Sequence, residues 1–189
     1  MTFFLRSISQ ITIVITALLM SFSVSAQSVQ YDLLKAIDRQ EINDLNEVLQ
    51  KGVSPDTRRR SDGMPAIVLA AQTGNIAILK ALLDGGANVN LGDRLRGETA
   101  LMIRSTAGDT NAVKLLLTYD ADPNRADIGQ ETALMKAVRG RKFKSAQALL
   151  EAGADPNVQD LTGKTALEYA KLSRSRRFIR LLQDAGATY

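Results

Sequence analysis

The sequence predicts an all-α repeat solenoid, because two independent marks recur along the chain with the same period. The first mark is a four-residue segment, Thr-Ala-Leu-Met in its plainest form, which begins at Pro65, Thr99, Thr132 and Thr165. The second mark is a residue pair that ends in alanine, at Gly86-Ala87, Asp120-Ala121, Gly153-Ala154 and Gly186-Ala187. Both marks repeat at spacings of 34, 33 and 33 residues. A repeat of this length cannot bury its apolar face alone, so neighbouring repeats must stack.

The segments between the marks resemble the ankyrin repeat. Leu149-Leu150 comes before Gly153-Ala154, and Asp155-Pro156-Asn157 follows it directly. The family pattern is a T-P-L-H-x-A-A turn and helix, a glycine, a second helix ending in Leu-Leu, then G-A-D-x-N and a finger loop. The resemblance covers Tyr31 to Tyr189 as five repeats, at about 31–60, 61–94, 95–127, 128–160 and 161–189. It implies five antiparallel helix pairs stacked side by side, with short finger loops along one edge.

We therefore expect ten helices and little regular strand. The predicted starts are Asp32, Ile42, Ala66, Ile76, Ala100, Thr110, Ala133, Phe143, Ala166 and Arg176. Polar side chains are expected to cap the two ends, where no further repeat covers the apolar face. The first repeat is accordingly acidic, and the last carries Lys171, Arg174, Arg176, Arg177 and Arg180.

Residues 1–26 have the organisation of a cleaved secretory signal peptide. Arg6 is followed by the apolar stretch Ile11–Val24, which is short for a membrane-spanning helix. Val24-Ser25-Ala26 supplies small residues at the cleavage site. We predict cleavage after Ala26, which leaves residues 27–189 as the mature repeat domain of a periplasmic or secreted bacterial protein; an uncleaved anchor is the alternative.

The composition argues against an enzyme. The chain has no cysteine and no histidine, which removes the commonest metal ligands, thiol nucleophiles and general bases. No phosphate-binding glycine motif is present, so no cofactor, metal or catalytic residue is predicted. Glu98 and Glu131 share one repeat position; we interpret them as finger residues, although a pair of acid and base groups is the functional alternative. A hydrolase with an unrecognised site therefore ranks last among the possible functions.

The finger loops are the candidate binding surface. They are expected at Asp56–Pro65, Asn90–Thr99, Asn124–Thr132 and Asn157–Thr165, and we number them one to four. Leu95, Ile128 and Leu161 share one position in fingers two to four, with arginines nearby. Apolar side chains flanked by arginine are typical of protein-binding hot spots; the alternative is that these side chains fold back onto the neighbouring finger. The predicted partner-binding residues are Arg59, Arg60, Arg94, Leu95, Arg96, Arg104, Ile128, Arg139 and Leu161.

Arg104 is included because it stands where the other repeats have Ala36, Ala70, Ala137 and Ala170. A side chain of this size must carry its charge to solvent or to a carboxylate. It is either an anchor on the concave helix face or a paired structural arginine.

Backbone strain is predicted at positions where glycine is replaced. Asp120 stands where the second mark has glycine elsewhere, so we expect a left-handed conformation there. Arg141 and Arg174 take the position of the inter-helix glycines Gly74 and Gly108, although Gly140 is an alternative turn residue in the fourth repeat.

Charge is distributed unevenly. Residues 133–183 carry 11 lysine and arginine residues against 4 aspartate and glutamate residues.

The resemblance implies a protein partner, of unknown identity, held by the fingers and the concave helix face. Association with an anionic membrane or cell-wall surface through the basic C-terminal repeats is the second hypothesis. We expect a monomer and no nucleic-acid partner.

Overall fold

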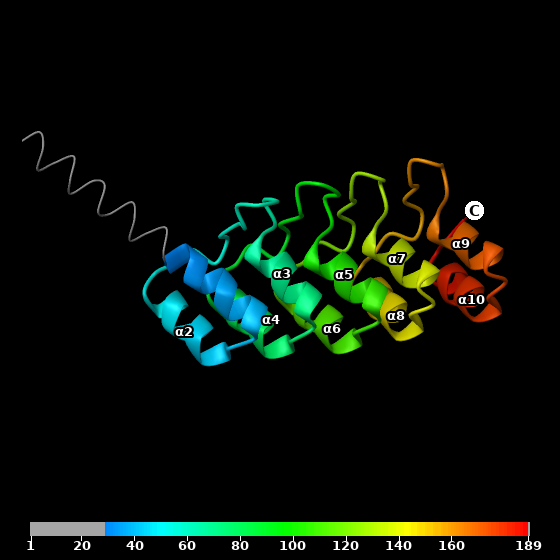
Figure 1. Ribbon diagram of the computed structural model, residues 1–189. Helices are drawn as coiled ribbons and strands as arrows, with labels where there is room; N and C mark the ends of the chain where they lie inside the picture. The colour runs from blue at the N-terminus through cyan, green and yellow to red at the C-terminus, as the bar shows by residue number, and fades with distance from the viewer. Residues whose placement is uncertain (1–28, 189) are drawn as a thin grey trace, which may run out of the picture.

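The computed structural model describes residues 29–188, and these form a single curved row of helix pairs with loops along one edge (Figure 1). The first helix is seen over residues 29–39. The helices that follow are α2 (Ile42–Gln50), α3 (Ala66–Thr73), α4 (Ile76–Asp84), α5 (Ala100–Ala107), α6 (Thr110–Thr118), α7 (Ala133–Arg139), α8 (Phe143–Glu151), α9 (Ala166–Leu172) and α10 (Arg176–Asp184). The predicted signal peptide, residues 1–26, lies outside the described residues.

The predicted helix starts are confirmed from α2 to α10, residue for residue. The first helix is an exception, because it is already helical at Val29 rather than from Asp32. Within residues 29–188 the only β-type pairings are isolated bridges inside the fingers, so the expectation of little regular strand also holds.

Threonine side chains start the first helix of the later repeats. Thr99, Thr132 and Thr165 each accept a hydrogen bond from the backbone amide three residues on. This contact satisfies one of the amides that a helix start leaves without a partner. The Thr-Ala-Leu mark is therefore a helix-start signal, which explains why its spacing predicted the starts so closely.

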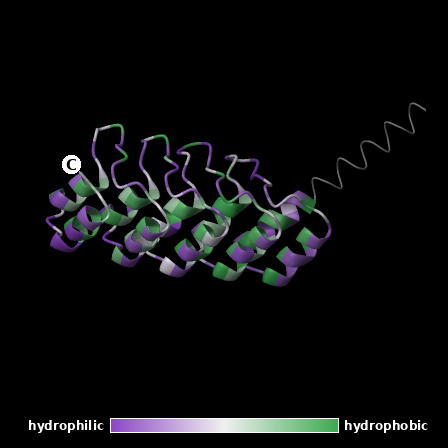
Figure 2. Ribbon diagram, turned by 180° about the vertical axis from the view of Figure 1, so that it is seen from behind, coloured by the Kyte–Doolittle hydropathy of each residue, from purple (hydrophilic) through white to green (hydrophobic). Residues whose placement is uncertain are grey.

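The helices form two rows. The first helices of the repeats, α3, α5, α7 and α9, lie next to the fingers, and the second helices, α4, α6, α8 and α10, lie behind them (Figure 1). Hydrophobic and hydrophilic residues alternate along the helix ribbons (Figure 2), and the hydrophobic ones supply the buried core. Leu79, Leu82, Leu116 and Leu149 are almost completely buried between the rows, and each such side chain contributes about 1.5–3 kcal/mol.

Two predictions about backbone strain are confirmed. Asp120 is left-handed, with φ at 60°. Arg141 and Arg174 are left-handed at φ of 57° and 51°. The alternative that Gly140 makes the turn of the fourth repeat is wrong, because Gly140 is right-handed at φ −73°.

Asparagine side chains tie each repeat to the next. Asn90 Oδ1 accepts the backbone amide of Asp122 at 2.8 Å, and its Nδ2 donates to the carbonyl of Asp120 at 3.2 Å. Asn124 and Asn157 make the same pair of contacts one and two repeats further along. Because these bonds satisfy backbone groups at the base of the fingers, they hold successive fingers in register.

Candidate functional site

The fingers are ordered loops. Asp93 Oδ1 accepts the backbone amides of Leu95 and Arg96 at 2.8 and 2.7 Å. Asp127 and Asp160 accept tip amides of fingers three and four in the same way. An aspartate that accepts backbone amides two or more residues ahead stabilises a tight turn, so the tips have a defined shape.

Backbone hydrogen bonds also join the tips to one another. The amide of Ile128 donates to the carbonyl of Arg96 at 2.8 Å, and the amide of Leu161 donates to the carbonyl of Gly129 at 3.0 Å. Fingers two, three and four therefore form one continuous edge.

The predicted apolar row is exposed on this edge. The exposed fractions of Leu95, Ile128 and Leu161 are 73%, 65% and 73%. The alternative that the side chains fold back onto neighbouring fingers is wrong for these three residues, because such packing would bury them, but it holds for Arg94. We call Arg94, Leu95, Arg96, Arg125, Ile128 and Leu161 the finger edge.

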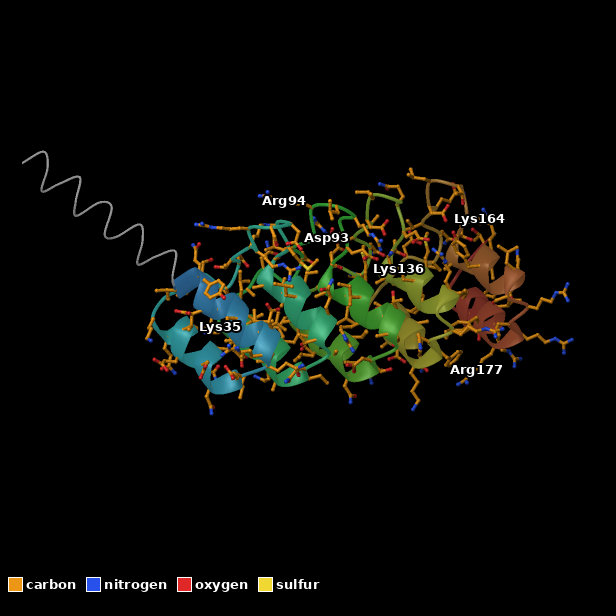
Figure 3. All side chains as sticks on the ribbon, in the orientation of Figure 1. Lys35, Asp93, Arg94, Lys136, Lys164 and Arg177 are labelled. Carbon is orange, nitrogen blue, oxygen red and sulfur yellow. The ribbon has the colours of Figure 1, made fainter. Side chains whose placement is uncertain are left out.

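Arginines flank the row. Arg94 is exposed at the outer end of the fingers, and its methylene groups lie across Gly63 of finger one, leaving no room there for a Cβ atom (Figure 3). Arg96 is three-quarters exposed and approaches Glu98 at 4.0 Å. Arg125 is exposed at the start of finger three.

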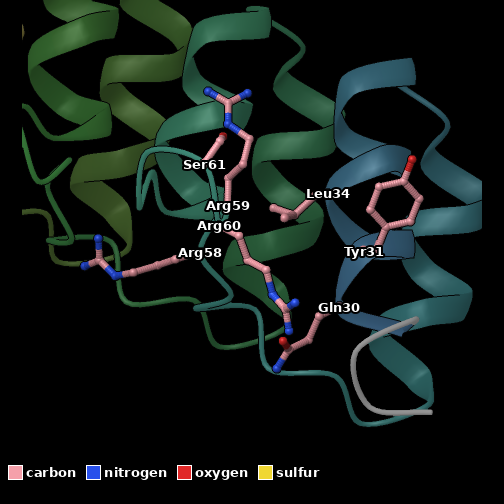
Figure 4. A pocket seen from close by; sticks show the side chains of 7 residues that line it. All are labelled: Gln30, Tyr31, Leu34, Arg58, Arg59, Arg60 and Ser61. Carbon is pink, nitrogen blue, oxygen red and sulfur yellow. The ribbon is translucent and has the colours of Figure 1, made fainter. Parts of the chain in front are cut away.

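The arginines of finger one have separate roles. Arg59 forms a close ion pair with Asp62 at 2.6 Å, and hydrogen bonds from Arg59 and the Met64 amide lower the pKa of Asp62 to about 2. Arg60 is exposed and lines a cavity of about 240 Å³ between the first helix and finger one. It reaches toward Gln30, whereas Arg58 and Arg59 point elsewhere (Figure 4).

A charged cluster lies where fingers two and three meet the first helices. The ammonium group of Lys136 is 2.8 Å from Glu98, 2.8 Å from Asp127 and 3.3 Å from Glu131. Burial opposes the charged form of Lys136, but hydrogen bonds from its ammonium to Asp127 and Glu98 outweigh it and raise its pKa. Burial likewise opposes ionisation of Asp127, yet hydrogen bonds from Lys136 and the Glu131 amide leave its pKa lowered.

Sequence reasoning missed the role of Lys136. The corresponding residues in other repeats are Leu69, Ile103 and Tyr169, so a lysine at a mostly apolar position was the available signal. Glu98 and Glu131 are finger residues, as interpreted, and they share one cation. Figure 3 shows Lys136 close to the helices, well behind the finger tips.

Arg139 extends the cluster toward the last repeat. Its guanidinium pairs with Glu131 and lies 5.2 Å from the centre of the Tyr169 ring. The Tyr169 hydroxyl donates to Asp160, and this bond raises the pKa of the tyrosine. Half of the Arg139 side chain remains exposed.

Arg104 does not join the finger edge. Its guanidinium donates to the carbonyl of Ala71 at 2.7 Å and to Asp109 at 3.0 Å, and only 12% of its side chain is exposed. The interpretation as a paired structural arginine is confirmed, because its donors bridge two neighbouring repeats. The alternative of a concave-face anchor has no exposed charge to support it.

We call Arg176, Arg177 and Arg180 of α10 the basic end, and Figure 3 shows Arg177 at the C-terminal end of the solenoid, away from the finger tips. Arg176, Arg177 and Arg180 of α10 are exposed. The guanidinium of Arg177 lies 3.6 Å from the centre of the Phe143 ring, a cation–π contact that holds it over α8.

Within residues 29–188, no group of three or more Asp, Glu, His or Cys side chains is arranged so that it could hold a metal ion. No helix in this range combines the length and apolar character that a bilayer span requires.

The fold and the exposed finger edge define a helical-repeat protein. The family model for ankyrin repeats in three copies matches residues 33–127 and 67–160. The chain therefore belongs to the ankyrin-repeat family, which confirms the resemblance seen in the sequence.

Curated relatives match part of the chain. They include the Ankyrin repeat, SAM and basic leucine zipper domain-containing protein 1 of Echinops telfairi, 32% identical over 111 residues, and that of Atelerix albiventris, 34% identical over 110 residues. Each match covers 56% of this chain, but only 23% and 22% of the respective relative. The chain thus spans less than a quarter of the length of these relatives.

Proposed function

We propose that this protein is an exported, non-catalytic scaffold that holds a partner protein on its finger edge and the adjoining concave helix face. Ankyrin repeats imply a protein-binding scaffold, since stacked repeats create extended concave surfaces that such proteins use for binding. The observation that carries the proposal is the exposed row of Leu95, Ile128 and Leu161 on loops that are otherwise firmly hydrogen-bonded. Ordered loops support tight binding because little conformational freedom is lost on association.

The test compares two double variants with the wild type. Leu95→Ala/Arg96→Ala removes one apolar contact and one charge from the finger edge. Arg177→Ala/Arg180→Ala removes two charges from the basic end and serves as the comparison. We expect a partner protein to be captured from cell extract by the wild type and by the basic-end variant. The same protein should not be captured by the finger variant. With a purified partner, the finger variant should bind more weakly by about 2–4 kcal/mol, as for a hot spot.

The finger variant should remain folded, because both residues are exposed loop side chains. Far-ultraviolet circular dichroism checks this point. An unchanged affinity in the folded finger variant would contradict the proposed surface.

The proposal includes export of the protein to the periplasm. The apolar stretch Ile11–Val24 and the small residues before Gln27 support it. Proteolytic release after Ala26 would deliver the scaffold to the periplasm, where a cysteine-free chain needs no disulfide to fold.

A second candidate function rests on the basic end. Lys142, Lys144 and Arg177 line a shallow cavity of about 230 Å³, next to the exposed arginines of α10. Such a surface suits an anionic lipid or cell-wall polymer. The test is sedimentation of the protein with phosphatidylglycerol vesicles. Wild-type protein that sediments at low salt but not at high salt, together with an Arg177→Ala/Arg180→Ala variant that does not sediment, would support this function over the first.

A further inference from the structure

The carboxylates of the fingers are all engaged within the protein. In finger one, Asp62 binds Arg59, and Asp56 accepts the amide of Asn88. In finger two, Asp93 accepts tip amides. The remaining finger carboxylates bind Lys136, as described above, or bind Tyr169 and tip amides, as Asp160 does.

The arginines of the finger edge, in contrast, are largely without carboxylate partners in the described part of the protein. Within residues 29–188, neither Arg94 nor Arg125 forms an ion pair with a carboxylate. Arg96 meets Glu98 only at 4.0 Å, a carboxylate that also binds Lys136 at 2.8 Å. A binding partner at this edge therefore meets guanidinium groups that no short ion pair within residues 29–188 engages.

The shape of the edge further restricts the partner. The backbone bonds between the tips place Leu95, Ile128 and Leu161 in a line along the solenoid, one per repeat. Guanidinium groups stand beside this line, and arginine favours carboxylates because its planar fork can donate two parallel hydrogen bonds. No aromatic side chain is present on the finger edge for stacking on bases, which a single-stranded nucleic acid would favour.

Building on the proposed function, we propose that the finger edge recognises an extended acidic segment of a partner protein. Apolar side chains of the segment contact the line of Leu95, Ile128 and Leu161, and its Asp or Glu residues pair with Arg94, Arg96 and Arg125. The apolar line supplies most of the affinity, while the arginines select for negative charge and orient the segment.

An unbiased selection tests this proposal. A displayed library of random peptides is selected on the purified protein, and the composition of the binders is compared with that of the library. We expect enrichment of Asp and Glu together with Leu, Ile or Phe. A selected peptide should lose affinity by about fivefold to tenfold in Arg94→Gln/Arg96→Gln and at raised salt.

The matched control is Arg177→Gln/Arg180→Gln, which removes the same charge from the basic end and should leave the affinity unchanged. Selected peptides that no longer bind the Leu95→Ala/Arg96→Ala variant, but are not enriched in Asp and Glu, would overturn the inference of an acidic segment. That result would leave the proposed function intact. Binders that ignore every finger variant would instead overturn the proposed function. Phosphatidylglycerol vesicles or oligonucleotides that bind through Arg94 and Arg96, while acidic peptides do not, would also overturn the inference.

Discussion

Replacing Lys136 with methionine should reveal how much the charged cluster contributes to stability. Lys136→Met keeps most of the length of the side chain but leaves Glu98, Asp127 and Glu131 without their shared cation. The side-chain exposed fractions are 11% for Lys136, 24% for Glu98, 7% for Asp127 and 18% for Glu131. The carboxylates are therefore largely shielded from water that could replace the ammonium group.

The magnitude follows from this geometry. Removing one partner of a fully buried ion pair costs about 3–5 kcal/mol. Two features reduce that value here: Asp127 keeps backbone donors, and Glu131 keeps Arg139. We expect Lys136→Met to lower the free energy of unfolding by about 2–3 kcal/mol at pH 7.

The effect should also depend on pH. The pKa of Asp127 is lowered below its ordinary value of 3.8 in the folded protein. Its contribution to stability is therefore present above that value and is lost as the pH falls through the folded-state pKa. The difference between wild type and variant should shrink as the pH falls below 3.8, because protonated Asp127 no longer needs the lysine.

Urea unfolding followed by far-ultraviolet circular dichroism measures both effects. Lys51→Met is the matched control, since Lys51 pairs with Glu47 at 2.6 Å on the surface, with side chains 58% and 68% exposed. The control should lose far less stability than Lys136→Met, because solvent screens an exposed pair. Equal losses in the two variants, or a Lys136→Met protein as stable as wild type, would refute the reasoning.

Three further predictions concern the backbone, the inter-repeat contacts and export. Asp120→Gly should leave the free energy of unfolding unchanged or raise it by up to about 1 kcal/mol, because glycine adopts the left-handed conformation without strain. Gly153→Ala should lose about that amount to left-handed strain, although open space surrounds Gly153. Urea unfolding midpoints measure both effects, and a clear loss of stability in Asp120→Gly would count against the argument. Asn124→Ala removes both bonds to the next repeat and should cost about 1 kcal/mol in the same assay; no loss would mean that water replaces those bonds. The purified periplasmic protein should begin at Gln27 by N-terminal sequencing, and an intact leader on a cytosolic protein would exclude export.

Much of the fold could be predicted from the sequence because its signals are local. Thr99, Thr132 and Thr165 start helices through contacts that span only three residues. The glycine that Asp120 replaces marks a left-handed turn in the other repeats, so the conformation of Asp120 followed from spacing alone. The start of the first helix was less predictable, because no copy of either repeat mark stands before it.

The candidate site was predicted only in part. Leu95, Ile128 and Leu161 share a repeat position at finger tips, and their exposure follows from that position. The direction of a long charged side chain does not follow in the same way. Arg104 could have faced a partner or a neighbouring repeat, and only the position of Asp109 and of the Ala71 carbonyl made it structural.

The sequence by itself determined the period, the helix starts and the exposed apolar row of this protein, because each depends on residues within one repeat. The tertiary structure decided which charges are neutralised internally and which remain available. Lys136 meets Glu98 from 38 residues earlier in the chain, and Arg94 lies across Gly63 of the preceding finger. Such contacts depend on how closely one repeat stacks on the next, a distance that is set by the packing of buried side chains and that no single repeat encodes.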